Sequence, residues 1–365
     1  MPDKPVSRRN FLAAAGAAPA AAAGASPAAA SPAPQSTLRA QGDPIRVVTM
    51  YQFEPAEIRQ IQETVPNAKV EITICNSRDE FRTKLRDAEV VYGDVRGNEL
   101  DYAPKLKWVQ AGGAGVENLD PRFRESSIVL TNFARTFAPG ISETAMGLLL
   151  CLTRGISRYY MPQFLRREWK PMGTVKSDHH VELVGRTMGI VGMGGIGTAV
   201  ARRAYYGFDM RVVGTDAKPI PKPDFVSELH DPSWFDTMVP QVDVLVSAAP
   251  LTPQTRQMFN ENVFRRMKKT AYFLGLSRGG LIDDMALVKA LKEGWIAGAG
   301  LDVFPQEPIP SSHPIFDCPN VVMTPHTSGW SPDRQVRLIA LFADNMRRFS
   351  VGQPLVNVVD KQAGY

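Results

Sequence analysis

The chain has 365 residues, a length that suggests about two domains. With 44% hydrophobic and 22% charged residues, it is not expected to be intrinsically disordered. Its 42 Lys and Arg and 37 Asp and Glu give a net charge of +5, and no basic run is interleaved with aromatic residues, so nucleic acid is not an expected partner. The three cysteines, Cys75, Cys151 and Cys318, are too few and too widely spaced for a disulfide framework or a metal site, and we expect buried thiols.

Residues 1–43 differ in composition from the rest of the chain. A paired arginine in Ser7–Leu12 precedes a tract of Ala, Gly and Pro, with small residues for cleavage between Ala25 and Ala33. This pattern predicts a twin-arginine export signal, with the twin-arginine translocase as a transient partner and a periplasmic location. The protein would be cytoplasmic if the signal is not used, and an unstructured tail from a misplaced start codon is the alternative. Pro19 and Pro27 would interrupt a spanning helix, so no stable membrane anchor is expected.

From Pro44 onward, short apolar strands alternate with helices. The first series predicts strands over residues 45–51, 69–74, 89–92 and 106–109, and helices over 55–65 and 77–85. A long apolar helix is expected over 142–157, as the candidate start of a second domain. The second series predicts strands over 188–191, 210–214, 242–247, 271–276, 297–303 and 320–323, and a final amphipathic helix over 332–350. This alternation predicts an α/β fold with parallel sheets that helices cover on both faces.

A glycine-rich loop follows the first strand of the second series. It has the form G-x-G-x-x-G between an apolar strand and a helix, and the next strand ends in an acid 24 residues after the first glycine. Such a loop places helix amides against a pyrophosphate, and the acid accepts hydrogen bonds from the ribose. The acid also repels a 2′-phosphate, so we expect NAD rather than NADP. The plainer alternative is a tight turn and a solvated aspartate. The residues concerned are Gly192, Gly194, Gly195, Ile196, Gly197 and Asp216.

Three groups that can carry chemistry follow later strands. Arg278 comes after the apolar segment 272–274, Glu307 after 300–304 and His326 after 321–323. Each alone is typical of a salt bridge, a loop carboxylate or a capping histidine. Together they supply an anion-binding guanidinium, a carboxylate and an imidazole at strand ends, where open α/β sheets bind ligands.

These segments resemble the D-isomer-specific 2-hydroxyacid dehydrogenases, the group that includes phosphoglycerate dehydrogenase and glyoxylate/hydroxypyruvate reductase. The resemblance covers about residues 44 to 354 and keeps several motifs in one order. The matching stretches are Val184–Gly192, Ala249–Thr255, Ser277–Asp283, Ala297–Phe304, Glu307–Pro308 and Thr324–His326.

The resemblance implies an NAD-dependent oxidoreductase that interconverts a small D-2-hydroxy acid and its 2-keto acid. Arg278 would bind the substrate carboxylate and carbonyl oxygen, with Ala114 and Gly115 supplying backbone amides. His326 would be the acid in reduction and the base in oxidation, oriented and kept protonated by Glu307. The implied cofactor contacts beyond the glycine loop are Pro250, Thr255, Leu276, Ser277, Arg278, Asp302, His326 and Gly329, with Asp302 on the nicotinamide carboxamide.

The resemblance also implies two doubly wound parallel-sheet domains with a cleft between them. The expected flavodoxin-like substrate domain spans 44–145 with 331–365, and the expected Rossmann NAD-binding domain spans 146–330. The usual assembly is a homodimer through the cofactor domain.

The chain departs from the family's usual residues at several positions. Gly275 replaces an Asn, Glu117 an Asp and Ala248 a frequent His, while Arg135, Phe137 and Trp330 flank the expected substrate positions. An exported protein with tightly bound NAD, acting as a sensor or a bound-cofactor oxidoreductase, is the alternative function. A formate dehydrogenase is a third possibility, against which Glu307 argues, because that family pairs its histidine with Gln.

Overall fold

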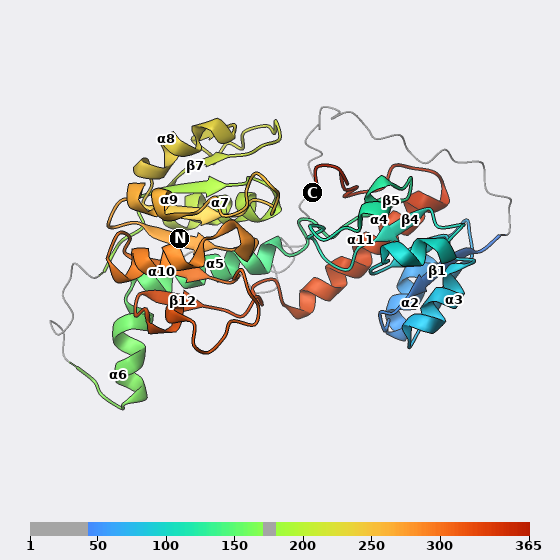
Figure 1. Cartoon of the computed structure of the whole chain (residues 1–365), viewed down its shortest axis with the longest axis horizontal. Coiled ribbons are helices and arrows are strands. Elements are labelled where there is room, and N and C mark those ends of the chain that lie inside the picture. Colours follow the sequence, from blue (N-terminus) through green and yellow to red (C-terminus); the bar gives the residue numbers. More distant parts are fainter. Residues whose placement is uncertain (1–42, 171–179) are drawn as a thin grey trace, which may run out of the picture. The chain divides into compact units, whose positions relative to one another are not determined.

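The computed structural model describes residues 43–170 and 180–365, so the predicted export signal lies outside the described residues. Five parallel strands form a first sheet in the order β2-β1-β3-β4-β5 (Figure 1). The order reverses direction between β1 and β3, which is the point where doubly wound sheets bind ligands. The strands are β1 (Ile45–Thr49), β2 (Val70–Ile74), β3 (Val90–Tyr92), β4 (Trp108–Gln110) and β5 (Val129–Thr131).

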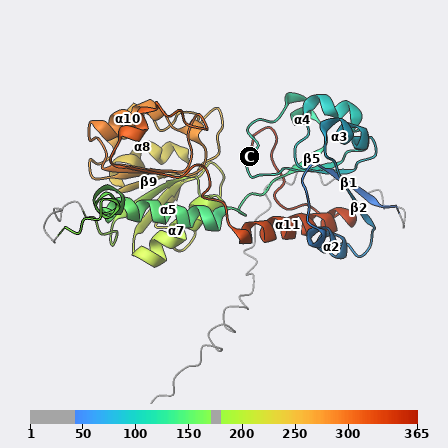
Figure 2. The same ribbon diagram turned by 90° about the horizontal axis from the view of Figure 1, so that it is seen from below.

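Helices cover both faces of this sheet (Figure 2). One face carries α2 (Pro55–Glu63) and α11 (Pro332–Ser350), which pack side by side, and the other carries α3 (Arg78–Leu85) and α4 (Pro121–Glu125). The buried face of α11 joins the core of the first sheet through Phe342 and Met346, although this helix comes last in the chain. A 3₁₀ helix, η1 (Gly97–Tyr102), follows β3.

Seven parallel strands form a second sheet in the order β12-β11-β10-β9-β6-β7-β8. This is the Rossmann order with one added strand, and its direction reverses between β6 and β9. The strands are β6 (Thr187–Val191), β7 (Arg211–Thr215), β8 (Glu228–His230), β9 (Val244–Ser247), β10 (Tyr272–Gly275), β11 (Gly298–Leu301) and β12 (Val321–Met323).

The second sheet is also covered on both faces. The helices α5 (Ala138–Thr153) and α7 (Gly195–Phe208) pack against each other on one face, and α8 (Phe235–Met238) and α10 (Asp284–Lys292) lie on the other (Figure 2). The remaining elements are α6 (Met161–Leu165), α9 (Glu261–Arg266), a π-helical turn η2 (Ile156–Tyr160) and the 3₁₀ helices η4 (Pro232–Trp234), η5 (Val239–Gln241), η6 (Gly279–Leu281) and η7 (Pro314–Asp317). The predicted α/β class with two parallel sheets is confirmed.

Some predicted elements were wrong in detail. The helix expected over 142–157 spans Ala138–Thr153, because Pro139 suits a first turn and Gly155, with φ of 66°, ends the regular helix. Strands β5 and β8 were not predicted. Both are edge strands, and β8 is partly exposed with Glu and His at its ends, so its apolar run is a single leucine. The final helix matches its predicted bounds.

Within residues 43–170 and 180–365, every helix is too short or too polar to span a membrane, and no cluster of three or more His, Cys, Asp or Glu side chains could hold a metal ion. The three cysteines are not paired. Cys75 and Cys318 are buried, as predicted, and burial raises the pKa of both thiols, whereas Cys151 is only partly buried.

Candidate active site

The glycine loop joins the end of β6 to the start of α7, and its geometry requires glycine at two positions. Gly192 has φ of 92°, and a Cβ there would lie 2.7 Å from the backbone of Ala249. A Cβ on Gly197 would lie 1.9 Å from the carbonyl oxygen of Gly192. The Cβ position of Gly194, the N-cap of α7, has nothing within 4 Å. The loop is therefore tight where it packs on the sheet and open where a phosphate would approach the helix amides.

Asp216 follows β7 and contacts this loop directly. One carboxylate oxygen accepts a hydrogen bond from the Met193 amide (2.7 Å), and the other accepts from the Lys218 amide (2.8 Å). A carboxylate offers about four acceptor positions, so Asp216 keeps capacity for two hydroxyl donors. The predicted ribose acid thus lies beside the predicted phosphate loop.

The other predicted cofactor contacts lie at the carboxyl ends of β9 and β10. Thr255 donates to the Pro250 carbonyl (2.7 Å) and so closes the turn after β9, while Leu276 and Ser277 are buried after β10. The hydroxyls of Ser247 and Ser277 are buried and have no hydrogen-bond partner among the described residues. Unpaired buried hydroxyls at this edge, together with the open glycine loop, fit a bound dinucleotide.

His326 and Glu307 form a hydrogen-bonded pair. The Nδ1 atom of His326 lies 2.7 Å from Glu307 Oε2, and Glu307 Oε1 accepts from the Phe304 amide (2.8 Å). Because an ionised carboxylate only accepts, His326 Nδ1 carries a proton in this pair, which leaves Nε2 for a substrate. The His326 side chain is 45% exposed, so its ring is accessible to a ligand.

Asp302 organises the turn that carries His326. Its carboxylate is 1% exposed and accepts hydrogen bonds from the Thr324 hydroxyl (2.6 Å), the Thr327 amide (3.0 Å) and the Ser328 amide and hydroxyl. Its carbonyl accepts from the His326 amide (2.9 Å). These bonds hold His326 at φ of 54°, a left-handed conformation that a histidine rarely adopts. The expected contact of Asp302 with the nicotinamide carboxamide stays a prediction.

Arg278 lies against the loop that is predicted to bind the substrate carboxylate. Its Nε donates to Glu117, and Nη1 donates to the Ser277 carbonyl (2.7 Å). A Cβ on Gly115 would lie 1.8 Å from Arg278 Nη2, so only glycine permits this approach. Arg278, Gly115 and Glu117 are thus brought together from segments far apart in sequence. Ala114 is held separately, through its carbonyl, by Asn132 Nδ2 (2.7 Å).

Three further residues near the site make contacts that the sequence alone does not indicate. The Cα, Cβ and Cγ atoms of Arg135 lie within about 3 Å of where a Cβ on Gly195 would be, at the start of α7. Gly275 is enclosed, since an added Cβ would meet Ile282 and Leu301 at 2.9 and 3.0 Å, so the family's usual Asn would require these side chains to shift. Gly329 lies against Phe137.

The arrangement provides the parts of an acid–base reaction on an anionic substrate. It offers a guanidinium beside a glycine loop, an imidazole held by a carboxylate, and a phosphate-type loop with its ribose acid. Among the described residues, no hydrogen bond or ion pair joins Arg278 to His326. Sequence motifs could have found neither the Glu117 nor the Arg135 contact, because both depend on residues distant in the chain.

Comparison with known proteins agrees with this geometry. The model of a family described as "D-isomer specific 2-hydroxyacid dehydrogenase, NAD binding domain" matches residues 146–328. The chain is 36% identical over 308 residues to a glyoxylate reductase of Korarchaeum cryptofilum, covering 82% of this chain and 88% of the relative. It is 33% identical over 300 residues to a D-3-phosphoglycerate dehydrogenase of Methanocaldococcus jannaschii, covering 80% of this chain and 55% of that relative.

A solved structure is similar over nearly the whole described chain. It is an NADPH-dependent glyoxylate/hydroxypyruvate reductase from Sinorhizobium meliloti in complex with NADP and sulfate. The TM-score is 0.72 at 29% identity, covering 88% of this chain and 99% of that chain.

Proposed function

Since the chain belongs to the family of D-isomer-specific 2-hydroxyacid dehydrogenases, we propose that it interconverts a small D-2-hydroxy acid and its 2-keto acid, with NAD as cofactor and His326 as acid and base. The observation that carries this proposal is the 2.7 Å contact between His326 and Glu307 in an NAD-binding enzyme of this family. An imidazole held in this way can act as the acid in one direction of the reaction and as the base in the other. The test is NADH oxidation with glyoxylate, hydroxypyruvate, pyruvate and phenylpyruvate.

The residues divide the work of reduction between them. Arg278 binds the substrate carboxylate, with the amides at Ala114 and Gly115 as further donors. The glycine loop and Asp216 would hold NADH, which would supply the hydride for C2. His326 Nε2 donates a proton to the carbonyl oxygen, which becomes the hydroxyl, and Glu307 stabilises the protonated ring and fixes its orientation. In oxidation the same nitrogen accepts the hydroxyl proton.

Two assignments of residue ranges follow from this proposal. We assign substrate binding to residues 44–145 with 331–365, and NAD binding to residues 146–330. The packing of α11 in the core of the first sheet supports the first assignment, and the extent of the family match supports the second. Arg135, whose stem lies against Gly195 at the start of α7, would add a positive charge beside the pyrophosphate.

Asp216 determines the preference for NAD over NADP in this proposal. The S. meliloti relative is NADPH-dependent by its description, so the preference of this chain needs its own test. We expect Asp216→Ala to lower the ratio of kcat/KM for NADH to that for NADPH by about tenfold or more, because ribose hydrogen bonds to a carboxylate are lost and repulsion of the 2′-phosphate ends. Steady-state rates with both coenzymes measure this ratio.

The matched control is Asp224→Ala, which removes an exposed acid from the loop after β7. That variant should keep the ratio of the unmodified chain. An unchanged ratio in Asp216→Ala would contradict the proposed role of Asp216.

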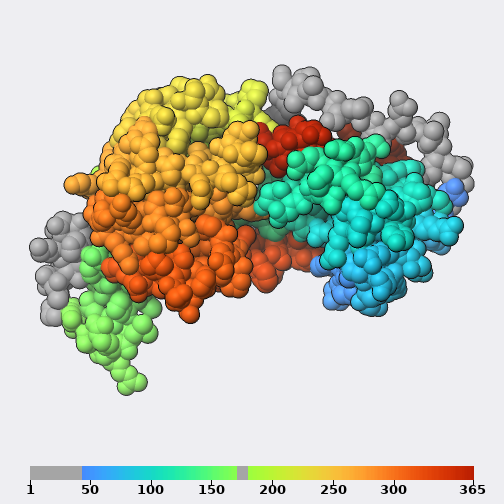
Figure 3. Space-filling model, viewed as in Figure 1, coloured from blue at the N-terminus to red at the C-terminus, as the bar shows by residue number. Residues whose placement is uncertain are grey.

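We propose a homodimer that covers an apolar segment around α6. The large exposed side chains of this segment are Ile156, Met161, Phe164, Leu165 and Trp169, with Leu165 79% and Trp169 85% exposed. Figure 3 shows the segment at the surface of the molecule. Monomeric proteins rarely expose such an apolar patch to solvent, and we propose that a second copy of this chain buries it.

In light scattering, the chain should have the mass of a dimer, and Leu165→Asp with Trp169→Asp should give a monomer. The control is Tyr102→Asp. Tyr102 is an exposed aromatic residue at the end of η1, and its replacement should leave the dimer intact. A monomeric unmodified chain would argue against this interface.

We propose export by the twin-arginine route, on the Arg8-Arg9 pair and the Ala-rich tract that follows it. The full chain, produced in a bacterium with this translocase, should appear in the periplasm as a shortened form. Arg8→Lys with Arg9→Lys should leave the uncleaved chain in the cytoplasm, which is detected by fractionation and mass spectrometry. If the unmodified chain and the Lys variant distribute equally between cytoplasm and periplasm, the result opposes export, and the protein would then be placed in the cytoplasm.

The alternative of an exported sensor with tightly bound NAD has no specific observation in its favour. A sensor needs no acid–base group, whereas this chain has an oriented imidazole and, beside the glycine loop at Gly115, the guanidinium of Arg278. The alternative of a formate dehydrogenase is disfavoured by Glu307, since hydride removal from formate needs no proton partner.

A further inference from the structure

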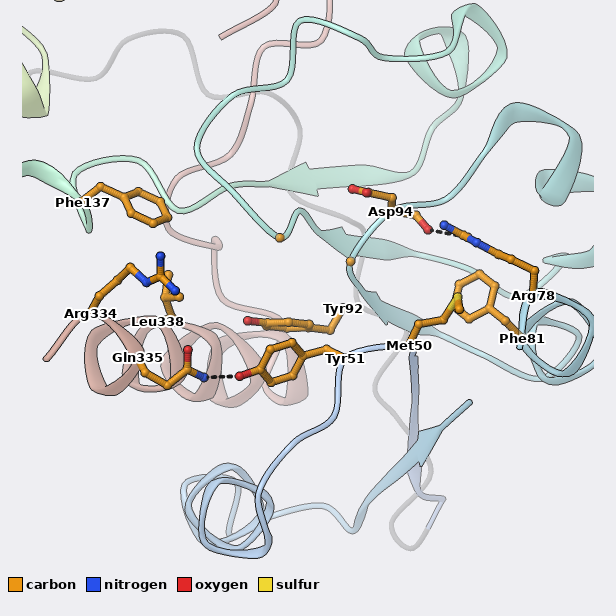
Figure 4. A pocket seen from close by; sticks show the side chains of 12 residues that line it. Met50, Tyr51, Arg78, Phe81, Tyr92, Asp94, Phe137, Arg334, Gln335 and Leu338 are labelled. Carbon is orange, nitrogen blue, oxygen red and sulfur yellow. Dashed lines mark hydrogen bonds between the residues drawn. The ribbon is translucent and has the colours of Figure 1, made fainter. Parts of the chain in front are cut away.

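A cavity of about 300 Å³ lies at the carboxyl end of the first sheet (Figure 4). Its walls include Met50 and Tyr51 after β1, and Tyr92, Gly93 and Asp94 at the end of β3. These two strands flank the point where the order of the sheet reverses, which is where doubly wound sheets bind ligands. The cavity therefore has the position and the size of a small-ligand site.

The cavity borders the proposed active site along the chain. Gly112 lines it and directly precedes the loop in which Gly115 meets Arg278. Phe137 lines it as well and lies against Gly329, three residues after His326. A substrate held by Arg278 and His326 would thus have this cavity within reach of its side chain. Glyoxylate, which has no side chain, would leave it empty.

One end of the cavity carries a cation without a counter-ion. Arg334, from the first turn of α11, forms no ion pair or hydrogen bond through its side chain among the described residues, and its Nε is buried without a partner. Its guanidinium stacks near the rings of Trp330 (5.0 Å) and Phe137 (5.9 Å). An unpaired guanidinium with a buried N–H strongly favours an anion.

The hydroxyls beside Arg334 are also available. Tyr92 is 4% exposed, its hydroxyl has no hydrogen-bond partner among the described residues, and in Figure 4 its oxygen points toward the side where Arg334 and Leu338 lie. Tyr51 is oriented by Gln335, whose Nε2 donates to the Tyr51 hydroxyl (2.7 Å). Burial raises the pKa of both phenols, so both stay protonated at neutral pH and can donate.

The opposite end of the cavity is electrostatically balanced. Arg78 donates to the fully buried Glu99 (3.1 Å) and to the Asp94 carbonyl (3.2 Å). Glu99 therefore neutralises the charge of Arg78, and the Asp94 side chain disfavours an anion at this end. The side chains of Met50, Phe81 and Leu338 add apolar surface to the walls of the cavity.

We propose that this cavity holds the side chain of the substrate, and that Arg334 with Tyr92 binds a second carboxylate at the end of the cavity that Phe137 also lines. The substrate class is then a 2-oxo acid that carries a distal carboxylate after a short apolar spacer, with the corresponding D-2-hydroxy diacid as the reduced form. This inference rests on the proposed function and narrows its substrate.

The test compares three substrates on the full chain. With 2-oxoglutarate, kcat/KM should exceed that with the uncharged analogue 2-oxohexanoate by about tenfold or more, since a charge-assisted contact is gained. Arg334→Met should bring this ratio close to one, and Arg334→Lys should restore part of the ratio. Arg59→Met, an exposed arginine of α2 outside the cavity, should retain the full ratio.

Glyoxylate turnover separates the two proposals. If glyoxylate is reduced but the ratio is near one, or is unaffected by Arg334→Met, the proposed function stands and the distal carboxylate site is wrong. If no oxo acid is turned over, calorimetry with glutarate in the presence of NADH decides. If the unmodified chain binds glutarate and Arg334→Met weakens this binding about tenfold, the result supports the site. If both proteins bind glutarate equally, or neither binds it, the result overturns the site.

Discussion

His326→Ala should lower kcat by about 10²- to 10⁴-fold while the KM for the keto acid changes little. The reason is that His326 is the proposed source of the proton that neutralises the oxygen at C2 as the hydride arrives. Without the imidazole, water must supply that proton from a less favourable position. Steady-state NADH oxidation over a range of substrate concentrations separates kcat from KM and so measures the effect.

The chain contains a matched control for this variant. His313 also pairs with a carboxylate, Asp284, at 3.1 Å, and it caps the 3₁₀ helix η7. His313→Ala should leave kcat per folded molecule unchanged, because neither His313 nor Asp284 contacts the proposed site. Glu307→Gln should lose less than His326→Ala, since Nε2 remains while the charge that stabilises the protonated ring is removed. Equal kcat in His326→Ala and the unmodified chain would remove His326 from the mechanism.

Arg278→Ala should lower kcat/KM for keto acids by about 10²- to 10³-fold, with both a higher KM and a lower kcat. The guanidinium is proposed to hold the substrate carboxylate and carbonyl oxygen, and the second contact strengthens as negative charge develops on that oxygen. Truncation also leaves Glu117 without its cationic partner beside the substrate loop. The same steady-state assay gives both constants.

Arg278→Lys distinguishes shape from charge at this position. A lysine keeps the positive charge but lacks the planar fork, so its kcat/KM should fall between those of Arg278→Ala and the unmodified chain. A Lys variant as active as the unmodified chain would exclude bidentate binding. Unchanged kcat/KM in Arg278→Ala would exclude Arg278 from substrate binding altogether.

Local patterns in the sequence predicted the sheets and the cofactor loop well. The glycine loop, the strand before it and Asp216 follow one another within one βαβ unit. Their spacing in the sequence therefore predicts their arrangement in space. The final helix was predicted over its observed range because its apolar side chains repeat at helical spacing and Pro332 marks its start. Strands β5 and β8 were missed at the edges of their sheets, and β8 has only one apolar residue, between Glu and His.

The contacts between distant segments were not predictable in this way. Arg278 and Glu117 are 161 residues apart, and no local pattern indicates that they meet. Arg334 illustrates the same point, because in the sequence it is one of several polar residues on an amphipathic helix. Only the packing of α11 beside β1 and β3 places its guanidinium in a cavity. The contact of Arg135 with Gly195 is a further example, because it depends on the packing of α5, which follows Arg135, on α7.

The central claim is that this chain reduces a small 2-keto acid with NADH through His326. The most direct measurement is the loss of NADH absorbance with glyoxylate and with hydroxypyruvate, for the unmodified full chain and for His326→Ala side by side. The account predicts turnover of at least one acid by the unmodified chain, and a loss of about 10²-fold or more in the variant. No turnover of either acid, or the same rate in both proteins, would contradict it.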